Sequence, residues 1–388
     1  MMGKPKIRFK GYNEDWEQRK LGEIATYRNG KAHEANQLDV GTYELVNLNS
    51  ISIDGGLKPS GKFIEDGSDT LQRNDLVMVL SDVGHGDLLG RVAIIPENNR
   101  YVLNQRVALL RINDDTNTYF LFSIINRYQD YFKKLGAGSS QLNISRGIVE
   151  NFEVAYPNVA EQRMIADYFQ SLDHLITLHQ HKCDEMKKLK KYMLQKMFPQ
   201  NGKKVPEIRF DGFTNDWEQR KLGDVVEFLD TMRKPLEGAK RISGPYPYYG
   251  ASGIVDYVDG YLFDEELVLL SEDGANITDR NYPVCFLASG KYWVNNHAHV
   301  LKTKGGNENN FICNSLERKD YKQYNSGMAM PKLNQEVCRG IPISCPSFDE
   351  QKKIGDYFRN LDHLITLHQH KCDELQNLKK YMLQNMFV

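Results

Sequence analysis

Two long stretches of the chain, residues 160–198 and 349–387, repeat apolar positions at alternating steps of four and three. This spacing is typical of the seam of a coiled-coil helix. Asn158 and Ser347 each stand three residues ahead of a glutamate, an arrangement that caps a helix start. The seam predicted for the first stretch consists of Ile165, Phe169, Leu172, Ile176, His179, Cys183, Met186, Met193 and Met197. The pattern therefore predicts two long helices.

Each predicted helix is longer than the core of an ordinary domain requires. The first stretch contains no glycine or proline and ends before Pro199 and Gly202. At 1.5 Å per residue, a helix of this length spans roughly 55 to 60 Å. We interpret both helices as spacers between globular parts.

The sequence contains an internal duplication. Residues 172–185 and 361–374 are the same fourteen residues, LDHLITLHQHKCDE, inside the predicted helices. Ahead of each helix, residues 7–22 and 208–223 also match, and both contain DWEQRKLG. The repeated unit is therefore a short segment, a variable region and a long helix.

The two variable regions differ in sequence but share one order of predicted elements, three strand-like runs followed by an amphipathic helix. These elements are residues 75–80, 91–95, 106–112 and 119–132 in the first region, and 266–270, 284–287, 299–303 and 310–324 in the second. We expect an α+β protein with two diverged copies of one mixed α/β domain. The expected boundaries are 1–157 and 202–346 for the domains, and 158–201 and 347–388 for the helices.

Composition narrows the class of protein. The chain has 388 residues and is 40% hydrophobic, which suffices for ordinary cores. Its longest apolar runs are strand-sized, so we expect a cytoplasmic protein without a membrane span or signal peptide. The six cysteines form no CxxC pair, which favours reduced, buried thiols. The net charge is -1, so a nucleic-acid-binding role would require segregated charges or help from partners.

The duplicated segment, the duplicated helix and the two unlike inserts together resemble a specificity subunit of a Type I restriction-modification enzyme. The resemblance covers the whole chain. Short motifs strengthen this resemblance. YYGASG and WVNNHAHVL are similar to stretches of the target-recognition domains of that family. The two LN pairs are at the positions where those domains end. These motifs are Glu161-Gln162 and Glu350-Gln351 at the helix starts, residues 248–253 and 293–301, and the pairs Leu142-Asn143 and Leu333-Asn334.

This resemblance implies a non-catalytic protein that selects the DNA sequence for a multisubunit enzyme. In the family, each variable domain reads one half of a split, asymmetric double-stranded DNA target, and the paired helices hold the halves apart and dock two methyltransferase subunits. Those subunits bind S-adenosylmethionine, and restriction or translocase subunits bring the ATP and Mg²⁺ chemistry. The resemblance therefore implies that this chain binds no cofactor itself.

Two like helices can bury their apolar seams against each other by packing antiparallel, which relates the two halves of the chain by an approximate two-fold axis. The DNA backbone has two-fold symmetry as well, so an inverted pair of readers presents the same face to both half-sites. Because the readers differ in sequence, the target need not be a palindrome. We therefore expect an antiparallel coiled coil, a pseudo-two-fold tandem repeat and a bipartite target.

Polar side chains in the turns of each variable region are the candidates for reading bases, because base edges are distinguished by hydrogen-bonding side chains. The candidates in the first region are Asn47, Asn49, Ser81, His85, Asn104, Gln105 and Arg106. Those in the second region are Tyr249, Ser252, Asn276, Asn295, Asn296, His297 and Lys332. The alternative for each of them is a structural role in a turn.

His179 and Cys183 lie one helical turn apart, and His368 and Cys372 occupy the same places in the second helix. In an antiparallel pair these four side chains could meet as a Cys2His2 metal set. A buried cysteine and a hydrogen-bonded histidine that fix the register of the seam are the alternative. We favour the second explanation, so no metal site is expected.

A helical adaptor that bridges two proteins is the competing function. Mild acidity of the variable regions favours the adaptor, whereas two unlike inserts on a duplicated scaffold favour DNA reading. The DWEQRKLG segments also have two interpretations. Either Trp16 and Trp217 seal each domain against a helix end, or the exposed charges form matched docking sites for two partner subunits.

Overall fold

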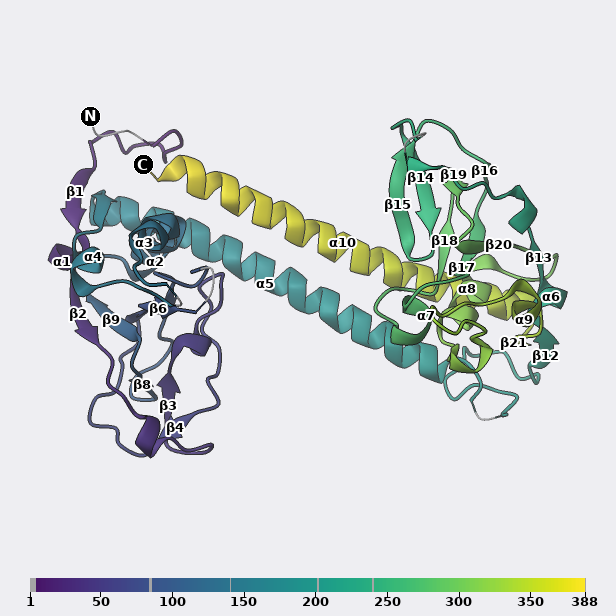
Figure 1. Ribbon diagram of the computed structural model, residues 1–388, viewed down its shortest axis with the longest axis horizontal. Helices are drawn as coiled ribbons and strands as arrows, with labels where there is room; N and C mark the ends of the chain where they lie inside the picture. Colours follow the sequence, from purple (N-terminus) through teal and green to yellow (C-terminus); the bar gives the residue numbers. More distant parts are fainter. Residues whose placement is uncertain (1–4, 84–85, 140, 201, 239–240, 388) are drawn as a thin grey trace. The chain divides into compact units, whose positions relative to one another are not determined.

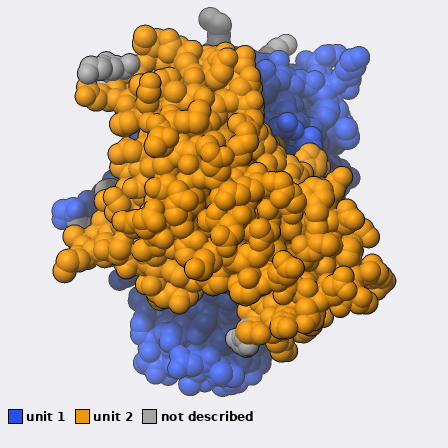
Figure 2. Space-filling model, turned by 90° about the vertical axis from the view of Figure 1, so that its right-hand side faces the viewer, with its two compact units in different colours: residues 1–179, 371–388 blue, residues 180–370 orange. Residues whose placement is uncertain are grey.

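The computed structural model describes residues 5–83, 86–139, 141–200, 202–238 and 241–387. The chain divides into two compact units, coloured separately in Figure 2. Unit 1 comprises residues 1–179 and 371–388, and unit 2 comprises residues 180–370. Each unit therefore contains one globular domain and one half of each long helix.

Both predicted long helices are confirmed. Helices α5 (Val159–Lys196) and α10 (Phe348–Met386) begin and end within two residues of the repeating stretches 160–198 and 349–387, and α5 ends five residues before the expected boundary at 201. Asn158 caps α5, because its side-chain oxygen accepts a hydrogen bond of 3.0 Å from the backbone N–H of Glu161. Every residue of the predicted seam of α5 is buried or partly buried. The apolar spacing thus predicted both the helices and their buried face.

In unit 1, the first half of α5 and the second half of α10 run antiparallel (Figure 1). Phe169 stacks on Phe387, with ring centroids 5.6 Å apart. Further along α5, Asp173 accepts a hydrogen bond of 2.5 Å from Nζ of Lys379. Residue numbers along α10 fall as those along α5 rise, as the antiparallel expectation requires.

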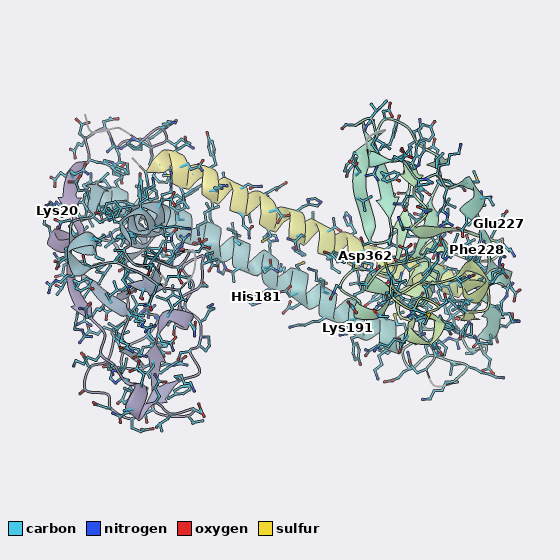
Figure 3. All side chains as sticks on the ribbon, in the orientation of Figure 1. Lys20, His181, Lys191, Glu227, Phe228 and Asp362 are labelled. Atoms are coloured by element: carbon cyan, nitrogen blue, oxygen red, sulfur yellow. The ribbon has the colours of Figure 1, made fainter. Side chains whose placement is uncertain are left out.

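The halves of the same helices that belong to unit 2 are also antiparallel. Lys190 of α5 donates a hydrogen bond of 2.6 Å to Asp362 of α10, which is labelled in Figure 3. Phe198 stacks on Phe358, with ring centroids 6.1 Å apart. Unit 1 has the same ion pair and the same phenylalanine stack, but there the aspartate comes from α5 and the lysine from α10. The contacts between the two helices are therefore repeated in both units.

The domain of unit 1 contains two larger β-sheets, two short strand pairs and four short helices within its described residues. The strands are β1 (Glu17–Lys20), β2 (Ala25–Asn29), β3 (Tyr43–Val46), β4 (Phe63–Ile64), β5 (Leu76–Val79), β6 (Ser81–Asp82), β7 (Val92–Ile94), β8 (Tyr101–Leu103), β9 (Val107–Ile112), β10 (Leu142–Asn143) and β11 (Glu153–Tyr156). The helices are α1 (Leu21–Ile24), α2 (Thr118–Arg127), α3 (Gln129–Leu135) and α4 (Arg146–Glu150), with 3-10 turns η1 (Glu34–Asn36) and η2 (Leu48–Ser50).

The domain of unit 2 is built from a similar set of elements. Its strands are β12 (Glu218–Lys221), β13 (Val226–Phe228), β14 (Tyr246–Gly250), β15 (Gly253–Val258), β16 (Phe263–Asp264), β17 (Leu267–Ser271), β18 (Cys285–Ala288), β19 (Lys291–Val294), β20 (Ala298–Thr303) and β21 (Pro342–Cys345). Its helices are α6 (Leu222–Val225), α7 (Asn276–Asp279), α8 (Asn309–Glu317) and α9 (Gln335–Arg339), with 3-10 turns η3 (Asp230–Met232) and η5 (Lys322–Tyr324).

One sheet is common to both units and the other differs. The antiparallel sheet β2-β9-β5-β7 of unit 1 corresponds strand for strand to β13-β20-β17-β18 of unit 2. These sheets contain the strands predicted in each variable region. The second sheets have the orders β4-β3-β8 and β15-β14-β19-β16, and each contains one parallel pair, β3 with β8 and β14 with β19. The difference between the domains is therefore concentrated in the second sheet.

The helix predicted after the strands is shorter than expected in both domains. In unit 1 it is divided at Tyr128 into α2 and α3. In unit 2 only α8 is regular, and η5 follows after Tyr321. Asp320 accepts a hydrogen bond of 3.0 Å from the backbone N–H of Lys322, a local contact that competes with continuation of a helix.

The repeated DWEQRKLG segments close each domain. Strand β1 pairs antiparallel with β11, and β12 pairs in the same way with β21. Trp16 and Trp217 are 6% and 4% exposed. Their rings pack edge-on against Phe120 and Phe311, at 6.3 and 5.7 Å between centroids. The expectation that both tryptophans seal their domains is confirmed.

The end of a long helix completes the core of each unit. Phe387, which directly follows α10, belongs to the buried core of unit 1, and Phe198, two residues after α5, belongs to that of unit 2. Beside each phenylalanine, the repeated segment is tied to the helix end by a backbone hydrogen bond, from Ile7 to Asn385 and from Ile208 to Lys196. Each domain is therefore built around parts of both helices.

Along the described residues, no helix combines the length and the apolar character that crossing a membrane requires.

Candidate nucleic-acid interface

The candidate base-reading residues of unit 1 gather where its two parallel strands end. Asn47 directly follows β3, and Asn104 directly follows β8. Val46 is paired with Leu103 in parallel register, so the two strands end at the same edge of the sheet. A hollow of about 410 Å³ at this edge is lined by five predicted residues, Asn47, Asn49, Asn104, Gln105 and Arg106. The structure thus unites candidates from two separate turns.

The asparagines of this hollow have different roles. The side-chain oxygen of Asn47 accepts a hydrogen bond of 2.9 Å from the backbone N–H of Asn49 and caps the turn η2. Asn104 is buried, and its side-chain oxygen accepts a hydrogen bond of 2.8 Å from the backbone N–H of Gln105. The side chain of Asn49 is exposed. Asn47 and Asn104 therefore shape the hollow, whereas Asn49 is positioned to contact a ligand.

Arg106 is exposed and stands on a turn with unusual backbone geometry. Its φ of 69° lies in the left-handed region, which residues other than glycine rarely adopt. The carbonyl oxygen of Arg106 accepts a hydrogen bond of 2.9 Å from the N–H of Leu80, which holds the turn in place. Strain of this kind is concentrated at functional sites. Arg106 is therefore the strongest candidate base reader of unit 1.

Two further residues of this site were not predicted from the sequence. Glu34 lines the hollow and accepts a hydrogen bond from the side-chain amide of Gln105. Gly30 allows the close approach of the turn after β8, because a Cβ at position 30 would lie 1.8 Å from the carbonyl oxygen of Asn104. Both residues are far in sequence from the turn after β8, so the sequence pattern did not indicate that they contact it.

The other two candidates of unit 1 do not line the hollow. Ser81 of β6 is buried, and its hydroxyl donates a hydrogen bond of 2.7 Å to the side-chain oxygen of Asn143 in β10. Ser81 thus supports the pairing of β6 with β10, and its burial argues against direct base reading. The last candidate, His85, lies outside the described residues.

The candidates of unit 2 gather at the equivalent place. Tyr249 lies in β14, and Asn295 directly follows β19, its parallel neighbour. The backbone N–H of Asn295 donates a hydrogen bond of 3.0 Å to the carbonyl oxygen of Tyr249. The buried side-chain oxygen of Asn295 accepts one of 2.8 Å from the N–H of His297. Two dissimilar domains thus place their candidates at the ends of a parallel strand pair.

Asn296, His297 and Lys332 are exposed around this strand end. Two acids that were not predicted lie beside them, in the turn after β17. Nδ1 of His297 lies 2.8 Å from Asp273, and Nζ of Lys332 lies 3.3 Å from Glu272. The acids balance the positive charge of this surface, which agrees with the net charge near zero.

Ser252 lies in the turn between β14 and β15, and Asn276, the first residue of α7, contacts that turn. Ser252 is exposed, whereas Asn276 is buried. The side-chain amide of Asn276 donates hydrogen bonds of 3.0 Å to Ser271 and 3.3 Å to the carbonyl oxygen of Ala251. Asn276 therefore supports the turn from inside, and its burial argues against direct base contact.

A buried charged network supports the surface of unit 2. Nδ1 of His299 lies 2.6 Å from Asp230, and Arg233 donates a hydrogen bond of 2.7 Å to Glu272. Burial opposes the charged form of the imidazole, but its hydrogen bonds to Asp230 and Cys338 raise the pKa of His299 to about 10. His299 therefore ties β20 to η3 through Asp230.

Asp230, Glu272 and His299 are the one group of three potential metal ligands within 4.8 Å in the described parts of the chain. Arg233 lies close to both carboxylates, 2.7 Å from Glu272 and 3.4 Å from Asp230. A guanidinium at this position repels a metal cation and already satisfies the acids. The group is therefore better explained as an ion-pair network than as a metal centre.

The cysteines of the helix seam contact the opposite helix. Sγ of Cys183 lies 3.9 Å from the carbonyl oxygen of Ile365 in unit 2, and Sγ of Cys372 lies 4.0 Å from that of Ile176 in unit 1. Both thiols are buried, as are the other four free cysteines. These contacts within each unit favour the role of fixing the seam register.

The repeated segments form a matched pair of hollows, one in each unit. The hollow of unit 1 has a volume of about 270 Å³ and borders the start of α5. That of unit 2 has a volume of about 360 Å³ and borders the start of α10. The lining residues related by the repeat are Asp15 and Asp216, Glu17 and Glu218, and Arg19 and Arg220. The same three charged residues of the repeated segment therefore line both hollows.

The two units thus repeat one frame and present two different polar surfaces. Comparison with known proteins identifies the family that has this organisation. The family described as the Type I restriction modification DNA specificity domain matches residues 13–188 and 214–377. The two matches cover most of the sequence, and the chain belongs to this family.

Curated relatives have the same description. The putative type I restriction enzyme specificity subunit S.HindORF215P of Haemophilus influenzae is 34% identical over 154 residues, which are 40% of this chain and 39% of that protein. The MjaVIII specificity subunit of Methanocaldococcus jannaschii is 22% identical, over 95% of this chain and 91% of that protein. The putative MjaX specificity subunit of the same organism is 23% identical, over 95% and 92%.

Solved structures share the fold. A crystal structure of a Type-I restriction-modification system S subunit from M. genitalium matches with a TM-score of 0.73 at 17% identity, over 100% of this chain and 99% of that one. A chain from a study of complex assembly and conformational transition of the type I R-M system matches with a TM-score of 0.51 at 16% identity, over 97% and 98%. The predicted fold class, a tandem repeat of two mixed α/β domains with two long helices, is confirmed.

Proposed function

We propose that this chain is the DNA-recognition subunit of a Type I restriction-modification complex and has no catalytic role of its own. The main support for this proposal is that the helix contacts are the same in both units while the polar surfaces at the strand ends differ. The frame repeats the ion pair between α5 and α10 in both units, whereas the exposed side chains at the ends of the parallel strand pairs differ. A protein that reads two unlike sequences on equivalent stretches of DNA requires this combination.

Each unit reads one half of a bipartite, asymmetric target in double-stranded DNA. Arginine can pair with guanine and asparagine with adenine through two hydrogen bonds. Asn49 and Arg106 read the first half, and Asn296, His297 and Lys332 read the second. The antiparallel pair of α5 and α10 sets the length of unread DNA between the halves.

The matched hollows at the repeated segments dock two identical methyltransferase subunits. Each hollow presents the same aspartate, glutamate and arginine beside the start of a long helix. Identical partners require identical docking surfaces, and the repeat supplies them. This role is compatible with the sealing function of the tryptophans, because the two use opposite faces of the segment.

The chemistry of the complex belongs to its other subunits. The methyltransferase subunits bind S-adenosylmethionine, and restriction or translocase subunits use ATP and Mg²⁺. This chain contributes target selection and binds none of these cofactors. The complex acts in the cytoplasm, where its DNA lies.

The acids beside the candidate readers predict weak DNA binding by the isolated chain. Glu34 lies at the surface of unit 1, and Glu272 and Asp273 pair with Lys332 and His297 in unit 2. Non-specific DNA affinity depends on lysine and arginine that neutralise phosphates. Partner subunits therefore supply much of the affinity, while this chain supplies the selection.

Mapping of methylated bases tests the proposed function. The chain is co-expressed with the proteins encoded beside its gene, and the modified positions of the host DNA are sequenced. We expect one motif with two unlike parts and a spacer of constant length. A palindromic motif, or methylation that does not depend on this chain, would contradict the proposal.

A domain exchange separates DNA reading from the adaptor function. Residues 23–157 are replaced by the corresponding domain of another family member, with the repeated segments and helices unchanged. We expect one half of the methylated motif to change and the other half to stay the same. An adaptor that only bridges proteins would leave the motif unaltered.

A further inference from the structure

The two units differ at a point where their frames otherwise repeat, the end of the helix that covers the common sheet. Near the end of α2, the side-chain oxygen of Asn126 accepts a hydrogen bond of 3.0 Å from the N–H of Val92 in β7. At the end of α8, the carboxylate of Glu317 accepts one of 2.9 Å from the N–H of Cys285 in β18. Strands β7 and β18 hold the same position in the common sheet. Asn126 and Glu317 are therefore structural equivalents, one neutral and one acidic.

In unit 2, the arginines near this point have acceptors inside the protein. Nη2 of Arg280 lies 2.8 Å from the carboxylate of Glu317. Nε of Arg318, the next residue, donates a hydrogen bond of 3.2 Å to the carbonyl oxygen of Leu194 on α5. The positive charge at this helix end is thus matched by an internal anion and a backbone acceptor.

In unit 1, Arg127 is the equivalent of Arg318, and Arg91, which precedes β7, lies near the same helix end. Arg91 donates a hydrogen bond of 2.9 Å from Nη1 to the carbonyl oxygen of Asn126. However, Nε of Arg91 and Nε of Arg127 are both buried without a hydrogen-bond partner among the described residues. Burial also lowers the pKa of Arg91. An unsatisfied buried donor on a charged group is costly, so two of them at one place require an explanation.

Both arginines line a cavity of about 490 Å³ in unit 1, between its domain and its parts of α5 and α10. Figure 1 shows α2 beside α5 at this place. Lys379 and Lys380 of α10 also line the cavity. Its two acids are engaged, Asp54 with the hydroxyl of Ser52 and Asp173 with Lys379. The described lining thus has four basic side chains against two acidic ones.

We propose that this cavity binds a phosphate group, whose oxygens face the four basic side chains of the lining, Arg91, Arg127, Lys379 and Lys380. Phosphate suits the site because its oxygens accept charge-assisted bonds from several guanidinium and ammonium groups at once. Unit 2 has no need of such a ligand at this helix end, since Glu317 supplies the negative charge from within. The phosphate comes either from the DNA backbone or from a free compound such as a nucleotide. The first of these sources rests on the proposed function.

Inorganic phosphate is the probe for the site. Its binding to the full-length chain is measured by calorimetry and by the shift of the melting temperature, at constant ionic strength with chloride as the competing anion. Arg91→Gln removes one of the four positive charges that line the cavity. Asn126→Glu places the carboxylate of unit 2 in unit 1, so that an internal anion competes with phosphate. Arg73→Gln is the matched control, because Arg73 is exposed in the same unit and does not line the cavity.

We expect wild type and Arg73→Gln to bind phosphate alike, and Arg91→Gln and Asn126→Glu to bind it at least about tenfold more weakly. Asn126→Glu is also expected to melt at the same or a higher temperature than wild type in phosphate-free buffer, which separates loss of the site from loss of folding. No phosphate binding by wild type, or equal binding by Asn126→Glu and Arg73→Gln, would overturn the proposal.

The salt dependence of DNA binding by the assembled complex distinguishes the two sources. If the DNA backbone supplies the phosphate, Arg91→Gln lowers the slope of log affinity against log salt by about one, and Arg73→Gln does not. If the slope is unchanged while inorganic phosphate still binds, a free phosphate compound is the source. Failure of sequence-specific methylation would refute the proposed function without affecting the phosphate measurement.

Discussion

Arg8 and Glu161 form a bidentate ion pair of 2.7 and 2.8 Å that joins the repeated segment to the start of α5. Their side chains are 15% and 0% exposed. Arg209 and Glu350 form the same pair in unit 2, at 2.7 and 2.9 Å. The EQ pair noticed at each helix start therefore provides the acid that anchors each repeated segment.

Replacement of Glu161 by glutamine should destabilise unit 1 by about 3 kcal/mol, because it leaves the Arg8 guanidinium without its buried anion. The change is measured as the shift of the urea unfolding midpoint. Glu150→Gln is the control, since the pair of Glu150 with Arg146 is largely exposed and contributes only about 0.3 to 0.5 kcal/mol. If both variants unfold at the same urea concentration, the anchoring role is wrong.

The stability of unit 2 should decrease as the pH rises from 6.5 toward 10. The pKa of His299 is raised from 6.5 to about 10 in the folded protein, so its stabilising contribution is complete below pH 6.5 and is lost as pH passes through the folded value. The slope contributed by one group is at most about 1.4 kcal/mol per pH unit.

The readout for this prediction is the difference between wild type and His299→Gln, because other groups titrate over the same range. The variant should show a flatter dependence of unfolding free energy on pH. His181→Gln, at an exposed position labelled in Figure 3, should behave as wild type. If the unfolding free energies of wild type and His299→Gln change with pH in parallel, the pair of Asp230 and His299 does not cause the pH dependence.

Base reading is tested by one substitution in each unit. Arg106→Ala should relax the first half of the methylated motif, and Lys332→Ala should relax the second. Each lost base contact should reduce discrimination by about 1 to 3 kcal/mol. The measurement is methylation of a library of target variants, and each substitution is the control for the other. If either substitution lowers sequence discrimination in both halves of the motif, the assignment of one half to each unit is wrong.

Periodicity predicted the parts of the fold that depend on local sequence. The apolar positions at alternating steps of four and three predicted α5 and α10. The short apolar runs predicted β5, β7 and β9 and their counterparts in unit 2. The predicted ends of the long helices were nearly correct, because Asn158 and Pro199 are local signals. What local sequence did not reveal is that Phe387 lies in the core of unit 1, since that contact joins the two ends of the chain.

The structure shows where the candidate residues lie, and their role in reading bases stays a prediction. Several of them are in the turns after β3, β8 and β19, where the sequence pattern placed polar turns. Their exposure depends on tertiary contacts, so Ser81 and Asn276 proved to be buried. The left-handed backbone of Arg106 and the pairing of Asp273 with His297 also depend on distant parts of the chain. Sequence pattern alone contains no signal for these features.

The central claim is that α5 and α10 set the distance between two half-sites. Its most direct test is the insertion of four residues, about one helical turn, after Gln180 in α5 and after Gln369 in α10. Each helix then lengthens by about 6 Å. Since base pairs are about 3.4 Å apart along DNA, the unread spacer should grow by one to two base pairs.

The measurement is the methylated motif of the lengthened protein compared with that of wild type. We expect both half-sites to keep their sequences while the spacer between them grows. A spacer of unchanged length, with both half-sites still methylated, would contradict the claim that these helices determine the separation.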